Sequence, residues 1–254
     1  MPQRPVAVFA LDFAQGATTG RHAHPFGQLV HAARGVMRVT ADRGTWIVPP
    51  LRAVWVPPRL EHEVVMVTSV ATRTVYIVPE ALPHAPVSSC VVSVSPLLRE
   101  LILEALRLPR PYPLGGSEER LFRVLLDRIA FGDVVPLHLP MPPDGLARDV
   151  ADALRADPSD GRTLAEWAAA VGASARTLAR EFSRTTSQSF GAWRAQLRLM
   201  KALELLAQRR SVTDVALSLG YDGPSAFIHA FRRHLGTTPS RYFESEELPR
   251  RGSP

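Results

Sequence analysis

The stretch VTDVALSLGYDGPSAFIHAFRRHLGTTPSRYF, residues 212–243, holds two helical patterns on either side of a glycine. Before Gly220, apolar residues follow the spacing i, i+3, i+4, i+7, and they are Val212, Val215, Ala216 and Leu219. After the glycine, the stripe continues at Phe227, Phe231 and Leu235. An apolar stripe at this spacing buries one face of a helix, and a second short helix after a turn projects outward. The stretch therefore predicts a helix-turn-helix unit.

A similar pattern occurs 48 residues earlier in the chain. The stretch LAEWAAAVGASARTLAREF, residues 164–182, breaks at Gly172. Its apolar stripe consists of Leu164, Trp167, Ala168, Val171, Leu178 and Phe182. Because each unit can place one helix in the major groove, two units in tandem predict two reading heads for duplex DNA.

The positive charge of the chain is concentrated in the same region. Residues 162–243 hold twelve Arg or Lys against five acidic residues, a net charge of +7, whereas the whole chain carries +6. A phosphate backbone attracts such a field because each neutralised phosphate releases counterions. A basic segment can also be a solvated face, so the charge supports DNA binding only together with the helical pattern.

These residues resemble the DNA-binding domain of AraC/XylS-type transcriptional regulators. Residues 212–243 are similar to the C-terminal signature of that family, and residues 164–182 to its first helix-turn-helix. RLMKALELL, residues 198–206, is similar to the helix that joins the two units. Phe243 departs from the family, which usually has Arg there, and Pro224 opens the second reading helix, where proline is tolerated. The resemblance implies a regulator of transcription.

Docking geometry selects the side chains that are expected to reach DNA bases, because the N-terminal residues of a recognition helix contact base edges. Arg176 and Arg180 can each offer a bidentate fork to guanine, so we expect the first unit to carry more of the sequence discrimination. Arg232 and Arg233 can equally contact phosphates alone. The complete set of expected DNA contacts is Ser174, Arg176, Thr177, Arg180, Ser225, Ile228, His229, Arg232 and Arg233.

The first eighty residues have the pattern of a β-domain. Short runs rich in β-branched residues, such as TWIVPP at 45–50, AVWVPP at 53–58 and TRTVYIVP at 72–79, alternate with Gly, Pro and charged residues. Such runs predict a small antiparallel barrel or sandwich, with the prolines at its corners. The sequence therefore predicts an α+β protein, in which a β-barrel precedes an all-α tandem helix-turn-helix domain.

Within this β-region, four polar side chains have the spacing of a metal site. His22 and His24 would share one face of a strand, with Gln28 four residues further on and His62 on a neighbouring strand. Such a set can close around one divalent ion, which we expect to be zinc, nickel, iron or manganese. The arrangement resembles the two motifs of cupin barrels, although Gln28 replaces the usual Glu. The second motif is degraded at Leu51, Arg59 and Met66.

The cupin resemblance implies a sensor domain, and it leaves two kinds of effector open. If a metal binds, its occupancy is expected to fall below about pH 6, because protonated imidazoles do not ligate. Alternatively, the histidines line an apolar mouth without a metal. The effector is then a small organic molecule in a pocket lined by Phe26, Trp46 and Trp55.

Between the two patterned regions, residues 97–106 and 118–131 have helical spacing, and the proline-rich segment LHLPMPPDG follows at 137–145. The apolar face of the first of these helices consists of Leu97, Leu98, Leu101, Ile102 and Leu106. Regulators of the resembled family usually pair through such a helix, so we expect a homodimer; alternatively, the face packs on its own barrel. The expected division is 1–80 for the cupin-like sensor barrel, 81–146 for dimerisation and linker, and 147–254 for DNA binding.

The remaining composition restricts where the protein acts. Its single cysteine, Cys90, excludes an internal disulfide framework and fits a reducing compartment. No apolar run reaches the length of a membrane span, and Asp12 interrupts the apolar N-terminus where a signal peptide needs continuity. We therefore expect a cytoplasmic protein without a membrane partner.

Three functions compete at this point. The favoured one is a regulator, not an enzyme, that binds double-stranded promoter DNA and senses a small molecule or metal. The second is a cupin metalloenzyme with a DNA-tethering domain, and the third is an architectural DNA-binding protein with a structural β-domain. The contrast between a pocketed, nearly neutral region and a basic one favours the regulator.

Overall fold

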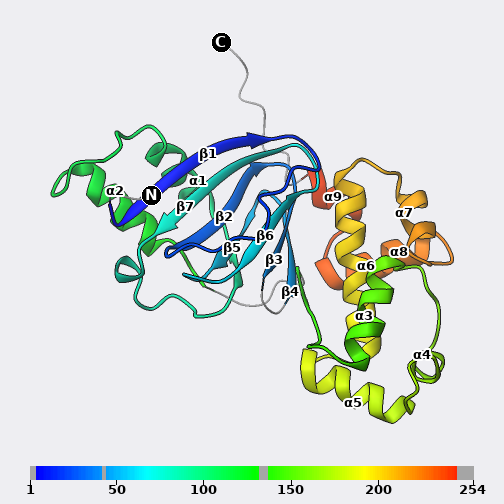
Figure 1. The fold of residues 1–254 in the computed structure, drawn as a ribbon. Helices are drawn as coiled ribbons and strands as arrows, with labels where there is room; N and C mark the ends of the chain where they lie inside the picture. The colour runs from blue at the N-terminus through cyan, green and yellow to red at the C-terminus, as the bar shows by residue number, and fades with distance from the viewer. Residues whose placement is uncertain (1–3, 42–43, 132–136, 245–254) are drawn as a thin grey trace. The chain divides into compact units, whose positions relative to one another are not determined.

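The computed structural model of the protein describes residues 4–41, 44–131 and 137–244 (Figure 1). The chain divides into two compact units. One comprises residues 1–42 and 46–137, and the other comprises residues 43–45 and 138–254. The predicted α+β class, with β-sheets followed by a helical region, is confirmed.

The first unit is built on a five-stranded sheet with the strand order β1-β7-β2-β5-β8, in which all neighbours are antiparallel. Its strands are β1 (Val6–Phe13), β7 (Val70–Ile77), β2 (Gly27–Arg34), β5 (Arg52–Val56) and β8 (Cys90–Ser93). A second sheet contains β6 (His62–Met66), β3 (Met37–Ala41) and β4 (Gly44–Val48) in that order. Side chains alternate between the two faces of the sheet along each strand, so neighbouring residues contact different parts of the fold.

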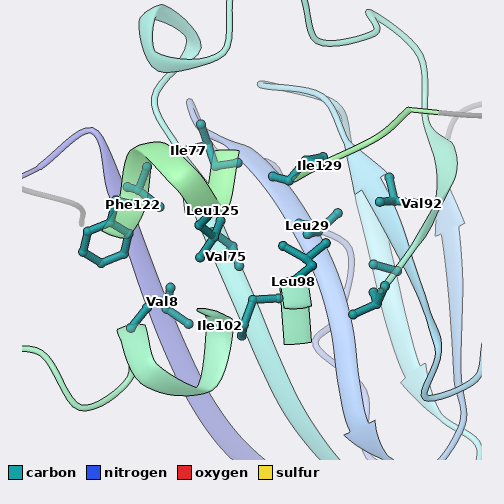
Figure 2. Packing of buried hydrophobic residues seen from close by; sticks show 14 of the residues in the cluster. Val8, Leu29, Val75, Ile77, Val92, Leu98, Ile102, Phe122, Leu125 and Ile129 are labelled. Carbon is teal, nitrogen blue, oxygen red and sulfur yellow. The ribbon is translucent and has the colours of Figure 1, made fainter. Parts of the chain in front are cut away.

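Helices α1 (Pro96–Ala105) and α2 (Ser117–Asp127) pack on one face of the five-stranded sheet, and a short 3-10 helix, η1 (Pro79–Ala81), follows β7. Figure 2 shows the resulting core, in which Leu29 and Val75 of the sheet lie among Leu98, Ile102 and Leu125 of the helices. This core places Gln28, the neighbour of Leu29, on the other face of the sheet.

The core corrects the expectation for the apolar face of α1. Leu98 and Ile102 are buried in the unit's own core, and Leu101 and Leu106 pack against it. Only Leu97, which is 52% exposed, remains largely open to solvent. The face therefore packs on its own sheet, because burying these side chains there already removes them from water. Homodimerisation stays a prediction that α1 no longer carries by itself.

From residue 138 to residue 244, the second unit is helical apart from a short strand, β9 (His138–Pro140). Its helices are α3 (Leu146–Ala156), α4 (Leu164–Ala170), α5 (Ala175–Thr186), α6 (Phe190–Ala207), α7 (Val212–Ser218), α8 (Pro224–Leu235) and α9 (Pro239–Glu244). Trp193 of α6 is fully buried, contacts the Phe182 ring, and donates its indole N–H to the Pro140 carbonyl at 2.7 Å. Part of the expected connector at 137–145 is thus held within the helical unit. Among the described helices, none has both the length and the apolar character that a membrane crossing requires.

Candidate functional site

The first unit brings together the four residues of the expected metal site. Backbone hydrogen bonds of 3.0 and 2.9 Å join His22 to His62 in both directions, so the segment before β2 is fixed against the start of β6. Each of the three histidines offers a ring nitrogen, and these nitrogens all lie within 4.8 Å of one another. Gln28 projects from β2 into the same cluster. We call these four residues the histidine cluster.

Each imidazole of the cluster is oriented by a backbone carbonyl. The Nδ1 atoms of His22, His24 and His62 lie 3.0, 2.8 and 2.9 Å from the carbonyl oxygens of Gly20, Phe26 and Leu60, in that order. A carbonyl oxygen only accepts, so each Nδ1 carries the proton and donates. The Nε2 atom of each neutral ring is then left with a lone pair, which is the form and the orientation of a metal-ligating histidine.

Gln28 places its amide oxygen at the meeting point of these lone pairs. Its Oε1 lies 3.0 Å from His24 Nε2 and 2.8 Å from His62 Nε2, and its Nε2 donates to the Tyr76 hydroxyl at 3.1 Å. Because each ring carries its proton on Nδ1, the Nε2 atoms of His24 and His62 are acceptors, and they face the Gln28 Oε1 atom, which is also an acceptor. A divalent cation at the centre would turn this repulsion into coordination. A reversed Gln28 amide would instead donate to both rings and accept from Tyr76, because amide orientation is inferred from the network.

Burial sets the protonation of the cluster. His62 is fully buried, and burial lowers its pKa to about 4, an effect to which the neighbouring rings of His22 and His24 add. His62 is therefore neutral near pH 7, as a ligand must be. Burial also raises the pKa of Tyr76, which keeps its hydroxyl protonated. His22 and His24 are half-buried, so the cluster is reachable from solvent.

Tyr76 was not among the expected site residues. Tyr76 reaches the cluster through the pairing of β2 with β7, in which it lies directly opposite Gln28. Its ring also packs edge-on against the His24 ring, with centroids 5.3 Å apart. Because the pairing register joins residues that are 48 apart in the chain, the sequence alone did not reveal it.

The expected organic pocket is not assembled by the structure. Trp55 pairs with Leu29 and lies in the helix-covered core, on the opposite face of the sheet from Gln28. Its indole N–H donates to the Pro86 carbonyl at 2.8 Å, and a Cβ on Gly27 would collide with its ring. Trp46 is buried in β4, and Phe26 contributes its carbonyl to His24. The three residues therefore do not line one cavity, because strand alternation sends Trp55 to the other side.

The two helix-turn-helix units have the expected local structure. Gly172 and Gly220 follow α4 and α7 with φ of +71° and +70°, a conformation that favours glycine and turns the chain into the next helix. Thr163 and Glu166 form a reciprocal capping box at the start of α4. Most residues of the predicted apolar stripes are buried, namely Trp167, Ala168, Leu178 and Phe182 in the first unit and Val215, Ala216, Leu219, Phe227 and Phe231 in the second. The remaining stripe residues are half-buried, namely Leu164, Val171, Val212 and Leu235.

The expected DNA contacts lie mostly on the outer surface of the second helix of each unit. In α5, Arg176 and Arg180 are exposed and Thr177 is half-buried. Of the expected contacts in α8, Ile228 is half-buried and the other four are exposed, namely Ser225, His229, Arg232 and Arg233. Ser174 is the N-cap of α5, because its hydroxyl accepts the Thr177 N–H at 3.1 Å. This bond gives Ser174 a structural role beside any contact with DNA.

Not every basic residue of this region is available to a phosphate. Arg198 of α6 is half-buried and donates to the carbonyl oxygens of Pro158, Ser159 and Asp160, at 2.8 to 3.3 Å. Burial lowers the pKa of its guanidinium group from the usual value. Arg162 lies over the Trp167 ring at 3.5 Å and pairs with Asp160. Arg198 and Arg162 therefore make contacts within the fold, which the charge count alone could not reveal.

Comparisons with known proteins match both units. Residues 6–125 match the AraC-like ligand binding domain family, and residues 167–245 match a helix-turn-helix domain family. The HTH-type transcriptional regulator NimR of Escherichia coli (strain K12) is 35% identical over 225 residues, which cover 89% of this chain and 82% of NimR. RipA of Corynebacterium glutamicum is 44% identical over 112 residues, covering 44% of this chain and 34% of RipA. Both are HTH-type transcriptional regulators, not enzymes.

Proposed function

The chain belongs to the AraC family of DNA-binding transcriptional regulators, with a ligand-binding domain before the helix-turn-helix domain, and from this premise we propose that its signal is a divalent metal ion. The observation that carries the proposal is the convergence of three carbonyl-oriented imidazoles and one amide oxygen. With Gln28 Oε1 facing the rings, all four groups present lone pairs to the centre of the cluster.

The donor set selects the class of metal. Three imidazole nitrogens and one amide oxygen suit zinc, nickel or iron, and manganese less strongly, whereas magnesium and calcium prefer oxygen ligands. One ring nitrogen from each histidine lies within 4.8 Å of the other two, which is close enough for one ion to be shared. Because His22 and His24 precede β2, Gln28 lies in β2 and His62 begins β6, an ion held by all four would fix these segments against one another, and we propose that this constraint is the signal that the first unit passes on.

Metal analysis of untagged protein purified without chelator tests this proposal. We expect about one zinc, nickel, iron or manganese ion per chain and its loss in the double variant His22→Ala, His24→Ala. His84→Ala is the matched control, because His84 is exposed and outside the cluster. Protein that is metal-free and takes up none of the four ions at micromolar concentration would show that the metal proposal is wrong.

Gln28→Glu separates metal binding from the hydrogen-bonded alternative. A carboxylate adds a negative charge beside the ring nitrogens, so metal affinity is expected to rise if the cluster is a metal site. If the cluster is instead a network with the Gln28 amide reversed, the same change removes its two donors and leaves neutral rings facing a carboxylate. The variant would then be less stable and would gain no metal affinity.

For the DNA side, we propose that α5 and α8 are the reading helices. The exposed guanidinium groups of Arg176 and Arg180 support base contacts by α5, and Ser225 and His229 support weaker contacts by α8. Metal binding in the first unit then alters how these helices engage a promoter. A metalloenzyme finds no support among the relatives, which are regulators.

A further inference from the structure

A cavity of about 270 Å³ lies against edge strand β1, separate from the histidine cluster. Val6, Val8, Ala105 and Phe122 give it apolar walls. Figure 2 shows Val8 and Phe122 together at one side of the core, where β1 runs past α2. Because Phe9, which also lines the cavity, alternates with Val8 along β1, the cavity lies at the edge of the sheet and reaches both of its faces, and it can hold the apolar body of a small ligand.

The polar groups of this edge-strand cavity are cationic. Arg4 and Arg110 line it, and among its described lining residues there is no carboxylate. Arg4 donates from Nε to the Tyr112 carbonyl at 2.8 Å. Arg110 is exposed, and within the described part of the chain it forms no ion pair. Apolar walls with a guanidinium group at the rim favour an anion that has an apolar body.

We propose that the edge-strand cavity binds a small organic acid with an apolar body, and that Arg110 holds its carboxylate. The guanidinium of Arg110 now lies over the Phe9 ring, 4.7 Å from the centroid. A carboxylate in the cavity competes with that ring for Arg110, because a charge-assisted hydrogen bond is stronger than an exposed cation–π contact.

The same ring connects the cavity with the histidine cluster. Phe9 packs edge-on against Tyr76, with centroids 5.7 Å apart, and the Tyr76 hydroxyl accepts a hydrogen bond from Gln28. Movement of Arg110 away from Phe9 therefore changes the packing of the tyrosine that positions Gln28. The acid is then a second input to the ligand-binding unit, and its route through Phe9 and Tyr76 requires no bound metal.

Calorimetric titration of the full chain with benzoate and octanoate tests the binding step, with benzamide and octanamide as uncharged counterparts. At least one acid is expected to bind, and its amide to bind far more weakly. Arg110→Gln should weaken acid binding about 10- to 100-fold, as expected for loss of a hydrogen bond to a charged group. Arg107→Gln is the matched control, because Arg107 pairs with Glu104 and does not line the cavity. Absence of binding at millimolar acid, or equal loss in both variants, would overturn the proposal.

Carbon-detected resonances of the tyrosine rings test the connection without reference to any metal. The acid should shift the ring signals of Tyr112, which lines the cavity, and those of Tyr76, which does not. In Phe9→Leu, the Tyr112 shift should persist and the Tyr76 shift should disappear. The role of Phe9 would be overturned if the Tyr76 signal did not shift with the acid in the unsubstituted protein, or if it shifted equally in Phe9→Leu. Failure of the metal proposal would leave both of these results unchanged.

Discussion

The β-rich unit and the helical unit place their chemically active side chains in opposite surroundings. In the first, His62 and Gln28 are buried and meet partners from other strands inside the fold. In the second, Arg176 and Arg180 stand exposed on a helix whose other face is buried. The first unit is thus suited to enclose a small ligand, and the second to present charge to a large one. This difference predicts that low pH lowers the stability of the first unit, whereas salt lowers the affinity of the second unit for DNA.

The largest expected effect concerns His31, a buried imidazole of β2 outside the histidine cluster. Burial lowers its pKa from 6.5 to about 4, and the nearby charges of Arg99 and Arg73 act in the same direction, while its bond to the Arg52 carbonyl opposes them. The folded protein therefore binds this proton less readily than the unfolded chain. Its contribution to stability is complete above pH 6.5 and is lost progressively as the pH falls towards 4, by at most about 3 kcal/mol.

Urea unfolding of the full chain between pH 7 and pH 4 measures this effect. The variant His31→Gln should lose less free energy of unfolding over that range than the unsubstituted protein. His84→Gln, at an exposed position, should retain the full pH dependence. Equal slopes for all three proteins would contradict the assignment of acid sensitivity to His31.

The next effect concerns the exposed arginines of the helical unit. Arg176→Ala should weaken binding to a cognate duplex by about 1–3 kcal/mol and hardly change binding to random DNA, because a base contact is lost. Arg233→Ala should weaken both alike and reduce the salt slope by about 1, because a phosphate contact is lost. Fluorescence anisotropy with both duplexes at several salt concentrations measures this. Equal losses on cognate and random DNA for Arg176→Ala would remove its base-reading role.

The smallest effect separates capping from DNA contact. Ser174 caps α5 through the Thr177 N–H, whereas Gly223, the N-cap residue of α8, offers no side-chain cap. Ser174→Ala should therefore cost about 1 kcal/mol of unfolding free energy. Ser225→Ala, at an exposed position of α8, should stay within about 0.5 kcal/mol. Thermal unfolding of the two variants side by side decides this, and equal losses would show that the Ser174 hydrogen bond contributes nothing.

The sequence predicted the helical unit in detail because its signals are local. The helix stripes and the breaks at Gly172 and Gly220 lie within a few residues of the structure they specify. The role of Arg198 was the exception, because its carbonyl partners lie about 40 residues away in the chain. Local spacing identifies which residues are exposed on a helix, but it does not identify a distant backbone partner.

In the β-rich unit, the sequence predicted the residues of the cluster but not their surroundings. The spacing of His22, His24 and Gln28 was sufficient to predict their meeting with His62. The position of Trp55 was predicted wrongly because a strand sends neighbouring residues to opposite faces, and the pairing register that decides the face is not visible in one sequence. The apolar face of α1 was ambiguous for a related reason: packing on its own sheet and packing on a second chain require the same residues.

The affinity for a cognate duplex, measured with and without bound metal, tests the central claim most directly. A duplex selected from a random-sequence library serves as the cognate site, and zinc and nickel are each added to chelator-treated protein. We predict a 5- to 150-fold change in affinity, equivalent to about 1–3 kcal/mol of coupling, that is absent in the double variant His22→Ala, His24→Ala. Affinity for random DNA should not change. Identical cognate affinities with and without either metal would contradict the account.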